Sequence, residues 1–98
     1  MARIVWTERA LDDLEKLLEY IARDAPVTAR RFAQKMISRL ESLQEHPTLG
    51  GEVPEDDSHT YREVLQGAYR MIYRIEENTI YVVAIHHAAR LLDFDEEG

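Results

Sequence analysis

A chain of 98 residues, 45% of them hydrophobic and 32% charged, is long enough for one domain with one modest core. It contains no cysteine, which excludes a disulfide framework and a thiolate zinc site, and we expect no cofactor. A net charge of −7 argues against a simple nucleic-acid binder, because phosphate contacts need clustered lysines and arginines. With no apolar run near membrane-spanning length and no secretory signal, we expect a cytoplasmic protein without a membrane span.

The negative charge is concentrated in two short segments. Residues 52–57 and residues 93–98 each hold four acidic residues, whereas the stretch between them carries four arginines against three glutamates. Because the local field matters more than the net charge, this arginine-bearing stretch differs from the rest of the surface. We interpret residues 1–92 as a single domain and residues 93–98 as an acidic C-terminal tail.

The first predicted elements are a strand over Arg3–Trp6, which is rich in β-branched and aromatic residues, and a helix that follows it. Thr7 is a typical N-cap for this helix, and Glu8 places an anion in its first turn. Apolar residues then recur at intervals of three and four, as on one face of an amphipathic helix. They are Ala10, Leu11, Leu14, Leu17, Leu18 and Ile21.

A second amphipathic helix is predicted to begin at Pro26, because proline is well suited to the first turn, and to end before Pro47. A short link between two antiparallel helices gives a helical hairpin. Neither helix is stable alone in water, so both apolar faces must pack on another layer. The apolar face of the second helix comprises Ala29, Phe32, Ala33, Met36, Ile37, Leu40 and Leu43.

Strand signals dominate the second half of the chain. A polar, acidic loop is expected at 48–61, followed by strands over Arg62–Gln66, Tyr69–Ile75 and Ile80–His87. The order of one strand, two helices and a three-stranded meander predicts an α+β fold. In that fold a two-helix hairpin packs on one face of a mostly antiparallel sheet.

The turn at Glu77-Asn78 decides which side chains share a face of this sheet. If it is a two-residue hairpin, directly opposed residues point the same way and the register follows. Because a buried unpaired charge is costly, we expect the arginine-bearing face to be the open side of the sheet or its rim. That face would carry Arg70, Ile72, Arg74, Tyr81, Val83, Ile85 and His87. The other face would carry Tyr69, Met71, Tyr73, Ile75, Val82 and His86.

Short motifs follow one another in a fixed order along residues 3–92. The most specific is Tyr69-Arg70-x-x-Tyr73-Arg74 followed by His87-x-x-Arg90. Together the series resembles the RelE/ParE toxin superfamily of type II toxin–antitoxin systems, and is closer to its ParE-like plasmid-stabilisation toxins. The other matching pieces are Trp6-Thr7, Ala10, Asp13-Leu14, Tyr20-Ile21, Pro26, Ala29, Leu40, Leu43, Pro47, Gly50, Val53-Pro54-Glu55, Arg62-Glu63-Val64 and Ile85-His86-His87-Ala88-Ala89-Arg90.

The resemblance implies a compact RelE-like α+β toxin with one of two activities, and the fold does not choose between them. ParE-like members inhibit DNA gyrase, whereas RelE-like members are ribosome-dependent mRNA endonucleases. In the second case Arg70, Arg74, His87 and Arg90 would be the catalytic residues, with the arginines binding phosphate and His87 transferring protons. The acidic balance and the absence of an aromatic residue in Ala88-Ala89-Arg90-Leu91 favour the ParE-like interpretation.

The resemblance also implies a cognate antitoxin of ParD, RelB or Phd type from the same operon, and therefore a hetero-oligomer. Antitoxins commonly bind through an extended segment and a helix that place apolar anchors in grooves. We expect the antitoxin or the target to contact charged and apolar side chains of the C-terminal half. The candidates are Arg62, Arg70, Arg74, Arg90, Leu91, Leu92 and Phe94.

Ordinary structural roles are open alternatives for several of these residues. Arg74 could pair with Glu76 or Glu63 at the surface, for little gain in stability. His87 could be a hydrogen-bonded residue at the end of a strand. The three tyrosines at 69, 73 and 81 could pack against the helices. The four histidines match no metal-ligand spacing, so we expect no metal site.

Overall fold

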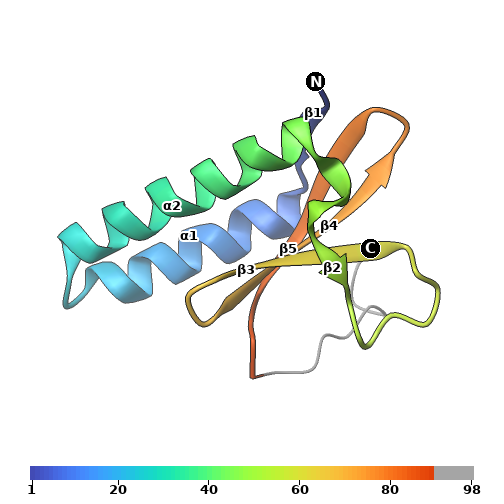
Figure 1. Ribbon diagram of the computed structural model, residues 1–98. Helices are drawn as coiled ribbons and strands as arrows, with labels where there is room; N and C mark the ends of the chain where they lie inside the picture. Colours follow the sequence, from blue (N-terminus) through green and yellow to red (C-terminus); the bar gives the residue numbers. More distant parts are fainter. Residues whose placement is uncertain (90–98) are drawn as a thin grey trace.

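The computed structural model describes residues 1–89, which form two helices packed side by side on one face of a five-stranded sheet (Figure 1). The predicted α+β fold with a helical hairpin is confirmed. The candidate residues Arg90, Leu91, Leu92 and Phe94 lie outside the described residues. The elements in chain order are β1 (Arg3–Trp6), α1 (Glu8–Ala22), α2 (Pro26–Glu45), η1 (Pro47–Leu49), β2 (Gly51–Glu52), β3 (Tyr61–Gln66), β4 (Tyr69–Glu76) and β5 (Thr79–His87).

The sheet has the strand order β1-β5-β4-β3-β2. β1 runs parallel to β5, and every other neighbouring pair is antiparallel, as the prediction of a mostly antiparallel sheet required. The meander of β3, β4 and β5 also lies where it was predicted, to within one residue at each end. β2 was not predicted, because a two-residue strand inside a polar loop has no periodicity to reveal it.

The two helices begin where their capping residues predict. The Thr7 hydroxyl accepts a hydrogen bond of 3.2 Å from the backbone N–H of Ala10, and Pro26 occupies the first turn of α2. Their apolar faces bury Ala10 and Leu17 from α1 and Met36, among others, from α2. No helix in the described part of the chain is both long and apolar enough to cross a membrane.

Apolar side chains fill both faces of the sheet. The larger cluster joins the helices to Met71, Tyr73 and Val82, which are fully buried. On the opposite side, which we call the open face, a smaller cluster is covered by the loop that carries Val53. It contains Val53, Ile72, Val83 and Ala84, with Tyr61 and Tyr81 packed against it. Because successive strand residues alternate, Arg70 and Arg74 flank Ile72 on the face away from the helices, the side on which they were predicted.

A β-bulge in β5 changes the register that the sequence predicted. Next to the Glu77-Asn78 turn the pairing is as expected, with Arg74 opposite Tyr81. Past the shift between Ile72 and Tyr73, Arg70 lies opposite His86 and Tyr69 lies opposite His87. The extra residue reverses the side of every later side chain in β5. The predictions that Ile85 and His87 share the face of Arg70 and Arg74 are therefore wrong.

Side chains at the start of α1 hold this bulge. The Thr7 hydroxyl donates hydrogen bonds to the backbone carbonyls of Val82 (3.0 Å) and Val83 (3.4 Å). The Asp13 carboxylate accepts a hydrogen bond of 3.0 Å from the backbone N–H of Ile85. β1 pairs with β5 only as far as Trp6. Beyond that residue, Thr7 and Asp13 provide the hydrogen-bond partners that the backbone of β1 no longer gives to the edge of β5.

Candidate functional site on the open face

Arg70 is the central residue of the open face, and only 5% of it is exposed. Its guanidinium donates two parallel hydrogen bonds to Glu55, from Nη1 to Oε2 at 2.6 Å and from Nη2 to Oε1 at 2.7 Å. It also binds Glu63 Oε1, through Nε at 2.8 Å and Nη2 at 2.6 Å. The expectation that the arginine-bearing face is open is therefore wrong at Arg70, which lies on that face but is buried. We call Arg70, Glu55 and Glu63 the buried triad.

The buried triad joins two strands and a loop that are separate in the sequence. Glu63 comes from β3, two residues before Leu65, which pairs with Arg70 in the register of β3 and β4. Glu55 comes from the loop between β2 and β3. The hydrogen bonds that Arg70 donates to Glu55 outweigh the cost of burial, and together with those it donates to Glu63 they raise the pKa of Arg70 above its ordinary range. The guanidinium is therefore permanently charged, and two carboxylates neutralise its charge.

Arg74 lies at the rim of the open face, two side-chain repeats from Arg70 along β4. Its guanidinium carbon stands 4.3 Å from the centre of the Tyr81 ring, and its Nη2 is 3.3 Å from Glu76 Oε2. The pairing of Arg74 with Glu76, one of the two structural alternatives, is thus observed. A cation over an aromatic ring contributes about 0.5–1 kcal/mol at exposed sites. Arg74 keeps 30% of its side chain exposed, so it is accessible to a partner.

His87 lies on the helix side of the sheet. Its ring meets the ring of Tyr69 edge-on, with 5.3 Å between the centres, and its Nδ1 accepts a hydrogen bond of 3.1 Å from the backbone N–H of Ala89. Together with Asp13 and Tyr20 it lines a hollow of about 660 Å³ beside α1. His87 is therefore separated by the sheet from Arg70 and Arg74, with which a ribonuclease site would need it.

Arg62 also lies away from the other two arginines. In the register of β3 it pairs with Tyr73, which belongs to the helix side. Its Nη1 donates hydrogen bonds to the backbone carbonyls of Gly50 (2.8 Å) and Thr48 (3.3 Å). Arg62 thus holds the segment between α2 and β2.

Asp56, the residue after Glu55, fixes the conformation of the loop that carries both by accepting hydrogen bonds within it. The Asp56 carboxylate accepts hydrogen bonds from the Ser58 hydroxyl and from the backbone N–H groups of Ser58, Thr60 and Tyr61. Burial alone would raise the pKa of Asp56, but the hydrogen bonds from Ser58, Tyr61 and Thr60 outweigh it and lower the pKa below the ordinary value of 3.8. The charged form of Asp56 therefore stabilises the folded loop.

Replacing this carboxylate is expected to weaken the loop in a pH-dependent way. Asp56→Asn should lower the free energy of unfolding at pH 7, because it removes the charged acceptor of these hydrogen bonds. The loss should be only about 1 kcal/mol, because solvent screens them. Because the pKa of Asp56 is lower in the folded than in the unfolded chain, its carboxylate stabilises the fold at a pH above the unfolded-state pKa. This stabilisation is lost as the pH falls through the folded-state pKa. In urea titrations the difference between wild type and Asp56→Asn should therefore shrink below pH ~4. Asp57→Asn is the control, and an equal effect there would contradict the assignment.

The open face suits binding better than acid–base cleavage. A metal-free ribonuclease needs a proton donor, a proton acceptor and cations available to the developing phosphorane. The charge of Arg70 is already neutralised by Glu55 and Glu63, and His87 lies across the sheet. Within residues 1–89 no group of three or more histidine, aspartate or glutamate side chains could hold a metal ion. A hollow of about 520 Å³ next to the buried triad includes Pro54 and Leu65 in its wall.

Sequence reasoning missed both acidic members of the buried triad and the role of Asp13. The sequence suggested Glu63 only as a surface partner of Arg74, and Glu55 only as one of the acidic residues at 52–57, so neither was predicted to bind Arg70. The one available signal was the concentration of acids at 52–57, upstream of an arginine-bearing strand. This signal indicates that the acidic segment is attracted to the arginines, but it does not identify which acid binds which arginine. The geometry of a loop has no sequence period from which it could be predicted.

Comparison with known proteins gives concordant results. The family model described as "ParE toxin of type II toxin-antitoxin system, parDE" matches residues 4–92. The chain is 37% identical over 92 residues to "Toxin RelE2" of Caulobacter vibrioides, with 93% of this chain and all of that protein covered. It is 29% identical over 80 residues to "Toxin RelE3" of the same organism, covering 82% of this chain and 87% of the relative.

A solved structure has the same fold. The structure titled "Chromosomal ParDE TA system from P. aeruginosa" matches with a TM-score of 0.74 over 89% of this chain and 96% of its own. At 19% sequence identity this likeness concerns the fold alone.

Proposed function

The chain belongs to the ParE toxin family of type II toxin–antitoxin systems, and from that premise we propose that it inhibits DNA gyrase and is neutralised by a cognate antitoxin. Inhibition of this kind requires an interaction surface and no catalytic set. The domain matched by the family model ends at residue 92, which fits a single toxin domain at 1–92 followed by the acidic tail at 93–98.

The observation that carries the choice of gyrase is the state of Arg70. Two carboxylates bind its guanidinium, and only 5% of the residue is exposed. A cation in this state cannot stabilise a phosphorane without first losing Glu55 and Glu63. Arg70 instead holds the loop that carries Glu55 on the sheet. Such a supporting role is what we expect in a protein that acts by binding.

Arg74 is our candidate for contact with the antitoxin or gyrase on the open face. It is partly exposed, projects from the rim and stacks on Tyr81, which holds its guanidinium in place. Arginine and tyrosine are both frequent in binding hot spots. Arg62, Arg90, Leu91, Leu92 and Phe94 remain proposed contacts, while Arg70 is assigned to the support of this face.

A RelE-like ribosome-dependent mRNA endonuclease is the alternative. The name of the 37% identical relative, "Toxin RelE2", favours it, as does His86, which shares the face of Arg70. Under this alternative, His86 would take the acid–base role that His87 was predicted to have, with Arg74 near the phosphate.

Induction of the chain in a bacterial host without its antitoxin should arrest growth. Because gyrase is the proposed target, we expect loss of DNA supercoiling with intact mRNA, and rescue by coexpression of the antitoxin gene from the same operon. Arg74→Ala should reduce the arrest, whereas Arg23→Ala, an exposed control on the helical hairpin, should not. Normal growth under strong induction contradicts a toxin, and arrest with cleaved mRNA and normal DNA supercoiling contradicts gyrase as the target.

A further inference from the structure

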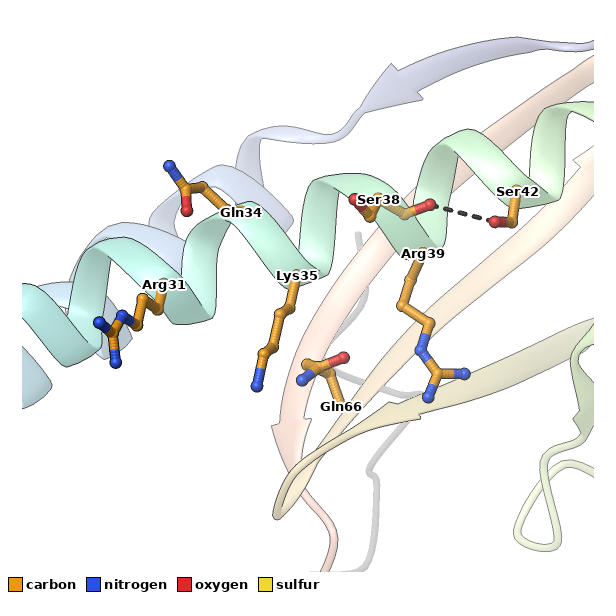
Figure 2. A pocket seen from close by; sticks show the side chains of 7 residues that line it. All are labelled: Arg31, Gln34, Lys35, Ser38, Arg39, Ser42 and Gln66. Carbon is orange, nitrogen blue, oxygen red and sulfur yellow. Dashed lines mark hydrogen bonds between the residues drawn. The ribbon is translucent and has the colours of Figure 1, made fainter.

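A polar trough of about 470 Å³ lies between α2 and the end of β3 (Figure 2). Three cations stand along it at intervals of four residues and project from the same side of α2. We call Arg31, Lys35 and Arg39 the α2 row. The rest of the wall is made of neutral polar side chains, with Gln66 on the β3 side and Gln34, Ser38 and Ser42 on the helix.

The α2 row is not neutralised within the described part of the chain. Arg9, Lys16, Arg70 and Arg74 have carboxylates within ion-pair distance, whereas no such partner stands by the α2 row in residues 1–89. All three residues are exposed. A protein with a net charge of −7 thus retains a local positive field on one side of α2, and the local field governs binding.

We propose that the α2 row binds the phosphate backbone of duplex DNA. Residues four apart on a helix rise by about 6 Å, so the row extends over about 12 Å. That length corresponds to about three or four phosphates of one strand, counted at 3.4 Å each along the duplex. Two guanidinium groups can bind phosphate oxygens bidentately, and Gln66, which faces the row from β3, is a typical neutral donor to phosphate (Figure 2).

The composition of the trough favours a phosphate backbone over other anionic partners. None of its seven lining residues is aromatic or apolar, whereas protein partners are usually held by buried aromatic or aliphatic anchors. Single-stranded nucleic acid is usually bound by stacking its bases on aromatic side chains, which the trough lacks. The choice of DNA over duplex RNA rests on the proposed function, because gyrase itself holds duplex DNA.

The test measures binding of the purified chain to a short labelled DNA duplex of arbitrary sequence by fluorescence anisotropy. Three neutralised phosphates predict a loss of affinity of about 40-fold between 50 and 200 mM salt. The triple variant Arg31→Gln/Lys35→Gln/Arg39→Gln should bind at least about 10-fold more weakly at low salt, with a nearly flat salt dependence. The control variant Arg3→Gln/Lys16→Gln/Arg23→Gln makes the same change in net charge at exposed positions elsewhere and should bind like wild type.

No binding by wild type at low salt, or equal binding by the row variant and wild type, would overturn the proposal. Tighter binding to the same duplex made of RNA, or to a glutamate-rich peptide, would overturn the assignment to DNA. Circular dichroism and thermal unfolding of each variant establish that the fold is kept. The supercoiling activity of gyrase is measured separately, so that failure of gyrase inhibition and failure of DNA binding by the α2 row are distinguished.

Discussion

Arg70→Met is expected to lower the free energy of unfolding by about 3–5 kcal/mol, because removal of one partner from a buried ion network leaves the others uncompensated. The substitution keeps an unbranched apolar stem but removes the guanidinium, so Glu55 and Glu63, whose side chains are only 15% and 19% exposed, are left without a cation. Urea unfolding at pH 7 measures the loss. Arg74→Met, at the partly exposed rim, is the matched control and should cost less than about 1 kcal/mol.

A second variant separates the support of the fold from a role in chemistry. Combining Arg70→Met with Glu55→Gln and Glu63→Gln removes all three charges, and we expect it to recover most of the lost stability. If Arg70 only supports the open face, this variant still arrests growth when it is induced. A stable triple variant that no longer arrests growth would show that the guanidinium itself acts on the target.

Gly50→Ala is expected to lower the free energy of unfolding by about 3 kcal/mol, because the site has no room for a methyl group. A Cβ at Gly50 would stand 2.5 Å from the hydroxyl oxygen of Tyr73 and 2.7 Å from the backbone carbonyl oxygen of Glu63. Tyr73 is fully buried, and its hydroxyl donates to the Pro47 carbonyl (2.7 Å) while accepting from the Gly50 N–H (3.0 Å). The Tyr73 hydroxyl cannot move without breaking these two bonds, and the Glu63 carbonyl belongs to the backbone of β3.

The neighbouring glycine provides the control. A Cβ at Gly51 would meet nothing within 4 Å, so Gly51→Ala should change stability by no more than about 0.5 kcal/mol. Thermal unfolding of the two variants side by side makes the comparison. Similar melting temperatures for Gly50→Ala and wild type would mean that the segment from Gly50 to Glu55 does not pack tightly on β3 and β4.

Periodicity and capping explain why the elements could be predicted. The apolar repeats of both helices, Thr7 as a cap and Pro26 as a first-turn residue are local signals, and both helices begin at these residues. The pairing of β3 with β4 and of β4 with β5 follows the preference of sequential strands for one another, whereas the parallel pairing of β1 with β5 does not. Tyr69 and Tyr73 pack on the helix side as the structural alternative had it, whereas Tyr81 packs on the open face.

The candidate site depended on interactions that are remote in the sequence. One extra residue in β5 moved His87 to the helix side, and the groups that hold the bulge, Thr7 and Asp13, lie more than 70 positions away. The burial of Arg70 likewise depends on Glu55, which reaches it from an irregular loop. Neither a bulge nor an ion pair across a loop has a period from which a sequence predicts it.

The most direct measurement of the proposed target adds the purified chain to two reactions side by side. One is supercoiling of DNA by gyrase, and the other is translation on ribosomes with the mRNA mapped by primer extension. Inhibition of supercoiling with intact mRNA is the predicted result, and Arg74→Ala should weaken that inhibition. Codon-dependent cuts in the mRNA with gyrase unaffected would contradict the proposal and assign the chain to the ribosome-dependent endonucleases.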